Sequence, residues 1–171
     1  RDVGGVAAGL GFAAPAVSEG GAGVFRGGVE APLWVKTLET RDGRTIVEVL
    51  EAGGQAFGAI DGLRRVSAWG EIRDWQLTRI SAYSLTPDTA RALASELGGA
   101  MDEVHATVII RTDNGEWMVD FTHAGATKAT AAAEFGRLVG VPVDEIAGVG
   151  DGFNDLPLLQ ACGTAVAMGQ A

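Results

Sequence analysis

The 171-residue sequence has 47% hydrophobic and 20% charged residues, so it can bury a core and is not a disordered chain. Its formal net charge of −9 argues against general binding of nucleic acid, and an anionic substrate would need a local lysine or divalent cation. No stretch reaches the roughly 20 apolar residues of a membrane span, and the single cysteine, Cys162, fits a reducing, cytoplasmic compartment.

The first part of the chain gives few structural signals. Residues 1–11 resemble the end of a helix, and the glycine-rich stretch 15–25 predicts a strand, a turn and a second strand. Arg41-Asp42-Gly43-Arg44 is typical of a turn, and residues 45–53 of a short helix. These signals indicate an α/β chain without settling the order of its strands.

The pattern becomes clearer from residue 77. Residues 77–83 alternate as in a half-buried strand. A helix is expected to begin at Thr86-Pro87, because a hydroxyl N-cap precedes a proline, and to end at Gly98-Gly99. A hairpin follows, with strands at 104–111 and 116–121 around the turn Asp113-Asn114-Gly115.

The last fifty residues alternate between helix and strand. We expect a helix from Lys128 to Val139 that Gly140 ends, with Ala132, Phe135 and Val139 on its buried face. A strand at 145–149, a helix through Leu159 and a strand at 164–168 follow. This order predicts parallel strands joined by crossover helices.

Carboxylates cluster directly after the strand at 145–149. Asp151 lies between two glycines at the expected carboxyl end of that strand, where parallel sheets bind ligands, and Asp155 begins the next helix. Two carboxylates at one crevice favour Mg²⁺, and Asn154 between them can donate to a phosphate oxygen. Helix capping is the alternative for Asp155 alone, but a cap needs one carboxylate rather than this whole run.

Lys128 is the second candidate. A cation in the first turn of a helix is unfavourable unless an anion binds there, so Lys128 indicates a phosphate site; a solvated surface lysine is the alternative. His123, Tyr83 and Trp75 are weaker candidates for lining a substrate pocket.

Three segments, in this order, resemble motifs of the haloacid dehalogenase-like superfamily, in particular of its Cof-type sugar-phosphatase branch, subfamily IIB. They are Lys128, the run Gly150 to Asp155 and the closing Val166-Ala167-Met168-Gly169. The resemblance implies a partial Rossmann-like parallel-sheet core with an inserted α/β cap domain. Its domains would be core at 1–26, cap at 27–121 and core at 122–171.

By the same resemblance, Lys128 is the catalytic lysine that binds the phosphoryl group and Asn154 contacts phosphate. Asp151 and Asp155 are the Mg²⁺ residues, with Asp151 the direct ligand, and the partner is a small-molecule phosphate ester. The run Glu19-Gly20-Gly21-Ala22 resembles the family pattern Glu-Asn-Gly-Ala with a glycine in place of the asparagine, which puts a substrate role there in doubt.

The family's nucleophile motif, Asp-x-Asp-Gly-Thr, does not occur in these 171 residues. We therefore expect a fragment, truncated at both ends, that turns over no substrate alone. The alternatives are a non-catalytic metal- or phosphate-binding module, a P-type ATPase and a phosphoserine-phosphatase-like enzyme. The identity of the substrate and the oligomeric state do not follow from the sequence.

Overall fold

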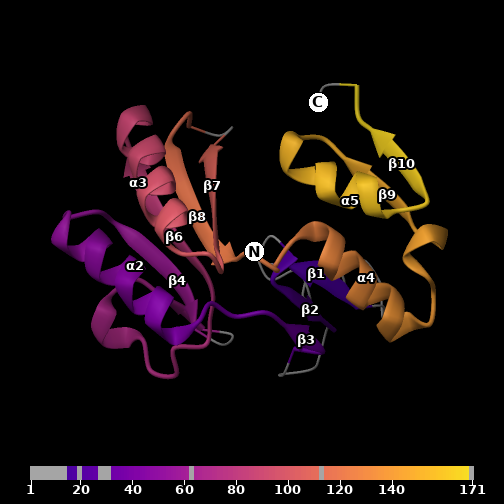
Figure 1. Cartoon of the computed structure of the whole chain (residues 1–171), viewed down its shortest axis with the longest axis horizontal. Helices are drawn as coiled ribbons and strands as arrows, with labels where there is room; N and C mark the ends of the chain where they lie inside the picture. Colours follow the sequence, from indigo (N-terminus) through magenta and orange to yellow (C-terminus); the bar gives the residue numbers. More distant parts are fainter. Residues whose placement is uncertain (1–14, 19–20, 27–31, 62–63, 112–113, 170–171) are drawn as a thin grey trace. The chain divides into compact units, whose positions relative to one another are not determined.

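The computed structural model describes residues 15–18, 21–26, 32–61, 64–111 and 114–169, so the helix expected at 1–11 lies outside the described residues. The chain divides into two compact units (Figure 1). Unit 1 consists of Arg1–Lys36 and Gly125–Ala171, and unit 2 of Thr37–Ala124. Within the part of the chain that the structure describes, no helix has the length and hydropathy of a membrane span.

Unit 2 is built on a five-stranded sheet in which every neighbouring pair is antiparallel. The strand order is β5-β4-β6-β8-β7. The elements are α2 (Thr40–Ala52), β4 (Phe57–Asp61), β5 (Arg64–Val66), the 3-10 turn η2 (Trp69–Glu71), β6 (Leu77–Leu85), α3 (Pro87–Ala100), β7 (Val104–Ile110) and β8 (Trp117–His123).

The core of unit 2 lies between the sheet and its two helices, α2 and α3 (Figure 1). Alternate residues of β6 enter it, because successive side chains of a strand point to opposite faces: Ile80 and Ala82 are fully buried. They join Ile46, Val47 and Leu50 of α2 and Ala90, Leu93 and Leu97 of α3. The strand, helix and hairpin expected from residue 77 onwards are confirmed, including the N-cap, where Thr86 Oγ1 accepts a hydrogen bond from the N–H of Thr89.

Two boundaries in unit 2 were predicted wrongly. Residues 41–44 form no turn but lie in the first turns of α2, which begins at Thr40. Tertiary packing overrides their turn propensity, because a Cβ on Gly43 would lie 3.2 Å from Leu77 Cδ1 and the Arg44 guanidinium lies 4.1 Å from the ring centre of Trp75. Trp75 is accordingly buried in the core.

The second wrong boundary is the end of α3. The helix does not stop at Gly98-Gly99 but continues to Ala100. A Cβ on Gly98 would lie only 2.9 Å from the Cβ of Ala106 on β7. This glycine therefore allows the helix to pack closely on the sheet rather than ending it.

The described residues of unit 1 form two small sheets. One is antiparallel, with strands β1 (Ala16–Ser18), β2 (Gly23–Phe25) and β3 (Trp34–Val35). The other pairs β9 (Ala147–Gly150) with β10 (Thr164–Ala167) in parallel, and α5 (Leu156–Ala161) connects them. Helix α4 (Lys128–Val139) contacts β1, β2 and α5. The predicted strand–helix–strand crossover and the α/β class are thus confirmed.

The buried face of α4 differs from the prediction. Ala131, Ala132 and Gly136 are buried, whereas Val139 is 39% exposed and Phe135 is half-buried. After Gly140, which ends the helix at φ 74° as expected, the chain folds back over Gly136. A Cβ on Gly136 would lie 2.3 Å from the carbonyl oxygen of Val141, so small residues form this face.

Strand β9 also begins later than expected. Residues Val143–Glu145 form a 3-10 turn, η3, and the strand starts at Ala147. At its carboxyl end a second 3-10 turn, η4 (Phe153–Asp155), leads into α5. The segment from Gly150 to Asp155 therefore connects the end of strand β9 to the start of helix α5.

Candidate functional site

The start of α4 and the loop after β9 meet through an ion pair in unit 1. Lys128 Nζ donates to Oδ1 of Asp155. The lysine side chain is 29% exposed and the aspartate side chain 8% exposed, so the pair is largely shielded from water. Two segments that are 27 positions apart in the sequence are joined here by opposite charges.

Asp155 also holds the loop that precedes it. Its Oδ2 accepts hydrogen bonds from the N–H groups of Asp151, at 3.0 Å, and Gly152, at 3.2 Å. Burial acts to raise the pKa of the Asp155 carboxyl, but the hydrogen bond and charge of Lys128 and the two N–H groups outweigh it and hold this pKa below its ordinary value. The carboxylate therefore stays ionised and engages donors with both oxygens.

Gly150 is required where the loop passes Asp155. A Cβ at this position would lie 2.4 Å from the Cβ of Asp155, much closer than two carbon atoms can approach. The glycine before Asp151 therefore makes room for the buried carboxylate. The sequence placed a glycine on each side of Asp151 but did not indicate this close approach.

Asp151 and Asn154 lie in the same loop, and both are exposed. Asp151 directly follows β9, at the carboxyl end of a parallel strand, which is where α/β sheets bind ligands. The structure thus brings Lys128, Asp151 and Asp155 together through direct contacts and keeps Asn154 one residue from Asp155.

Gly21 contacts this site, which sequence reasoning missed. Its φ is +106°, and a Cβ there would lie 2.5 Å from the carbonyl carbon and oxygen of Thr127 and 2.8 Å from the nitrogen of Lys128. Gly21 thus packs directly against the backbone at the start of α4. The glycine-rich run indicated a turn, and the family resemblance indicated a doubtful substrate role for it; neither predicted this close approach.

The start of α4 carries a second feature that was missed. Thr127 caps the helix by accepting from the N–H of Thr130 at 3.1 Å, and the Thr130 hydroxyl accepts from the N–H of Thr127 at 2.9 Å. This reciprocal capping fixes the backbone next to Lys128. The pair Thr-x-x-Thr was visible in the sequence, but it departs from the usual Glu or Gln at the second position.

The carboxylates of the site supply some, but not all, of the oxygen ligands that a hard divalent cation needs. No group of three or more His, Cys, Asp or Glu side chains that could hold a metal occurs among the residues that the structure describes. Asp151 offers an exposed carboxylate, whereas Asp155 is already engaged by three donors. One or two carboxylates completed by waters and substrate oxygens is the arrangement that Mg²⁺ accepts, so the residues fit that ion.

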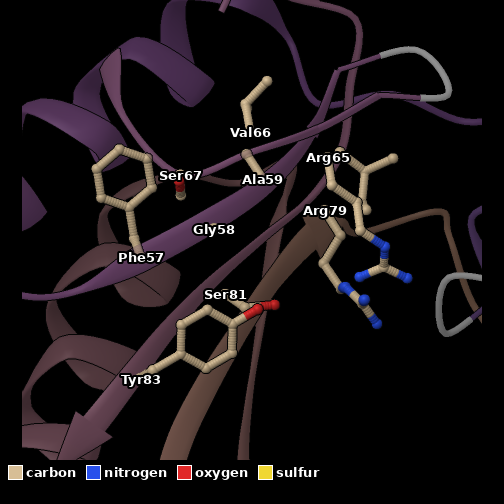
Figure 2. Close-up of a pocket in the computed structure, with 10 residues that line it drawn as sticks. Phe57, Gly58, Ala59, Arg65, Val66, Ser67, Arg79, Ser81 and Tyr83 are labelled. Atoms are coloured by element: carbon tan, nitrogen blue, oxygen red, sulfur yellow. The ribbon is translucent and has the colours of Figure 1, made fainter. Parts of the chain in front are cut away.

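The weaker candidates fall elsewhere. His123 belongs to unit 2, where its Nε2 lies 3.3 Å from Oε2 of Glu103. Tyr83 also belongs to unit 2 and lines a cavity there (Figure 2). Cys162 is buried in unit 1, where its Sγ would lie 3.1 Å from a Cβ on Gly148.

Known proteins resemble this chain in sequence and in fold. The model of the haloacid dehalogenase-like hydrolase family matches residues 71–171. Phosphatase YwpJ of Bacillus subtilis is 33% identical over 67 residues, which are 39% of this chain and 24% of that protein. The matched stretch therefore spans about a quarter of the curated relative.

Solved structures show the same fold over nearly the whole chain. A haloacid dehalogenase-like hydrolase from B. subtilis has a TM-score of 0.78 at 17% identity, covering 99% of this chain and 74% of that one. One from Bacteroides thetaiotaomicron has a TM-score of 0.79 at 16% identity, covering 98% and 71%. A subclass IIB sugar phosphatase of the same superfamily has a TM-score of 0.74 at 17% identity, covering 98% and 68%. With a family model that matches more than half of its residues, the chain belongs to the haloacid dehalogenase-like hydrolases.

Proposed function

We propose that the protein containing this chain is a magnesium-dependent phosphomonoester hydrolase that acts on a small phosphorylated metabolite, with a sugar phosphate as the expected class. The Lys128–Asp155 ion pair carries the proposal, because it holds a cation at a helix start beside the exposed carboxylate of Asp151. The likeness to phosphatase YwpJ and to a sugar phosphatase of subclass IIB supports it. In this proposal unit 2 is the cap domain.

The phosphoryl group of the substrate would bind at the start of α4. Lys128 supplies a positive charge there, and the N–H groups of the first helical turn add the positive end of the helix dipole. Asn154, in the loop opposite, has an amide that can donate to a third phosphate oxygen. Asp155 keeps Lys128 in place, so the lysine does not need to be ordered by the substrate.

Mg²⁺ would be held by Asp151 as the direct ligand, with Asp155 supporting the ion or its waters. When bound, the ion supplies positive charge that neutralises the phosphate oxygens. The contacts of Asp155 explain this division of roles, because its two oxygens already accept from Lys128 and from the backbone around Asp151. Asp155 thereby orients the loop that carries Asp151, the residue that would bind the metal.

The nucleophile is not among the 171 residues, which contain no Asp-x-Asp-Gly-Thr motif. We therefore expect the isolated chain to bind phosphate at Lys128 but to release none from an ester. A phosphatase reaction through an aspartyl-phosphate needs that carboxylate as its attacking group.

The test is an assay of the intact gene product with Mg²⁺ and p-nitrophenyl phosphate. We expect turnover that falls about 100-fold or more in both variants, because Lys128→Met removes a positive charge that faces the phosphoryl group and Asp151→Asn removes the carboxylate that would hold Mg²⁺. Glu134→Gln is the control, since it changes a half-buried charge on the same helix that pairs with Arg137 rather than with a residue of the site. An intact protein that is folded but inactive with every divalent metal would overturn the proposal in favour of a non-catalytic binding module.

A further inference from the structure

The hydroxyl of Thr130 lies at the centre of the hydrogen bonds around the start of α4, the helix that begins at Lys128. Its Oγ1 accepts from the N–H of Thr127 at 2.9 Å. It lies within donating distance of two carbonyl oxygens, that of Gly125 at 2.8 Å and that of Thr127 at 2.9 Å. The N–H of Thr130 in turn donates to Thr127 Oγ1 at 3.1 Å. One residue thus ties the first turn of the helix to the segment before it.

The single hydrogen of this hydroxyl is best placed to bond to Gly125. The carbonyl oxygen of Gly125 is the nearest acceptor, and that of Thr127 already accepts from the N–H of Ala131 at 3.0 Å. Gly125 is the first residue of the second segment of unit 1, directly after unit 2 ends at Ala124. Thr130 therefore joins the point at which the chain returns to unit 1 to the helix that carries the candidate lysine.

Helix α3 of the same chain begins with the same spacing of threonines and provides a comparison. Thr86 Oγ1 accepts from the N–H of Thr89 at 3.1 Å, and the two hydroxyl oxygens lie 2.8 Å apart. In the part of the chain that the structure describes, the Thr89 hydroxyl bonds to Thr86 and does not extend to the segment before it. A cap of this kind is sufficient to begin a helix. The additional bonds of Thr130 are therefore not needed for that purpose alone.

The side chain of Lys128 needs a fixed base as well as a partner at its tip. A lysine has a flexible four-carbon stem, so its ammonium group can move away from a phosphate unless both ends are held. Asp155 holds the Nζ end. At the other end Gly21 packs against the backbone nitrogen of Lys128, and Thr130 bonds across this nitrogen to the residues before it.

We propose that Thr130 is a positioning residue for Lys128, because it holds the backbone from which the lysine reaches both Asp155 and the phosphoryl group. Thr130 itself touches neither the phosphate nor the metal. Its effect on catalysis rests on the proposed phosphatase function, whereas its effect on the position of Lys128 can be measured without substrate. Thr130 thus extends the candidate site beyond the residues that would contact the ligands.

The position of Lys128 can be followed in NMR through its ammonium group, because the chain contains two lysines, Lys36 and Lys128. In the 171-residue chain labelled with ¹⁵N-lysine, Lys128→Met assigns the two signals. The ion pair with Asp155 should slow the exchange of the Lys128 ammonium hydrogens with water. We expect Thr130→Val and Thr130→Ala to speed this exchange about tenfold, and Thr130→Ser, which keeps the hydroxyl, to change it less than about twofold. Thr89→Val is the matched control and should leave the exchange unchanged, with Lys36 as the internal reference.

The effect on catalysis is measured with the intact gene product, Mg²⁺ and p-nitrophenyl phosphate. We expect kcat per folded molecule to fall about tenfold in Thr130→Val, because a displaced lysine stabilises the charge of the transition state less well. KM should change less than kcat, since the loss falls mainly on the transition state. Thr130→Ser should restore kcat, and Thr89→Val should not lower it.

Two results would overturn the proposal. The first is an unchanged Lys128 ammonium signal in both Thr130→Val and Thr130→Ala. The second is an equal fall of kcat in Thr89→Val, which would mean that any weakened helix cap has the same effect. An unmodified gene product without activity would contradict the phosphatase function, but the response of the Lys128 signal would still support the positioning role. Failure of one proposal is therefore distinguishable from failure of the other.

Discussion

Lys128 and Asp155 form an ion pair that joins the first residue of α4 to the residue that precedes α5. The same Asp155 carboxylate accepts from the backbone N–H groups of Asp151 and Gly152. A single buried side chain thus fixes both the cation and the loop that carries the exposed carboxylate. The geometry of the candidate site depends on this residue more than on Lys128, Asp151 or Asn154.

Asp155→Asn should destabilise unit 1 by about 1–3 kcal/mol, because it removes a charged acceptor from three buried or half-buried donors. The measurement is urea unfolding followed through the NMR signals of α4 and α5. In a double-mutant cycle with Lys128→Met, we expect a coupling energy of about 1 kcal/mol or more.

The control for this cycle is the pair Arg137–Glu134 on the surface of α4. Its atoms lie 2.8 Å apart, but its side chains are 65% and 30% exposed. Exposed pairs of this kind contribute about 0.3–0.5 kcal/mol. A coupling between Lys128 and Asp155 no larger than that of the control would contradict the structural role given to the pair.

Acid should weaken unit 1 through Asp155. Because the pKa of this carboxyl is lower in the folded than in the unfolded chain, its stabilising effect is complete above the ordinary aspartate value of about 3.9. The effect is lost as the pH falls through the lower folded value. The free energy of unfolding should therefore be measured between neutral and acid pH in the presence of EDTA. It should fall less steeply with decreasing pH in Asp155→Asn than in the unmodified chain. An equal fall in both would show that other groups control the acid transition.

Local signals in the sequence were sufficient wherever a cap or a regular alternation set the structure. The Thr86-Pro87 start of α3, the Gly140 end of α4 and the parallel pair β9 and β10 followed from them. The turn expected at 41–44 failed because Leu77 and Trp75, more than thirty positions away, hold those residues in a helix. Long-range packing of this kind has no periodicity that could be read in advance.

In the candidate site, too, local features were predicted and long-range contacts were not. Lys128, Asp151, Asn154 and Asp155 were found from residue types and spacing, and their roles remain predictions. The ion pair itself could not be foreseen, because neither partner indicates the other across 27 positions. The hydrogen bond from Thr130 to Gly125 was also missed, since residue types do not show which acceptor a hydroxyl reaches.

Asp61 should be essential to the stability of unit 2. Its side chain is 2% exposed and accepts from three backbone N–H groups, those of Arg73 at 2.7 Å and of Asp74 and Gln76 at 3.0 Å. Asp61→Ala leaves these donors without their acceptor and should cost about 2–4 kcal/mol. Thermal unfolding of unit 2, followed by near-ultraviolet circular dichroism, would measure it; Asp74→Ala, an exposed neighbour, should change stability by less than about 0.5 kcal/mol.

Gly21→Ala should disturb the start of α4. At φ +106° an alanine is strained, and its Cβ would also lie 2.5 Å from the Thr127 carbonyl, so the two costs add. Gly140→Ala in the same unit separates them, since Gly140 has φ +74° but nothing within 4 Å of an added methyl group. We expect a loss of about 1 kcal/mol for Gly140→Ala and at least about twice that for Gly21→Ala, measured by urea unfolding. In Gly21→Ala the amide signals of Thr127 and Lys128 should also move. Equal losses in the two variants, with unchanged signals at Lys128, would show that Gly21 serves only the turn in which it lies.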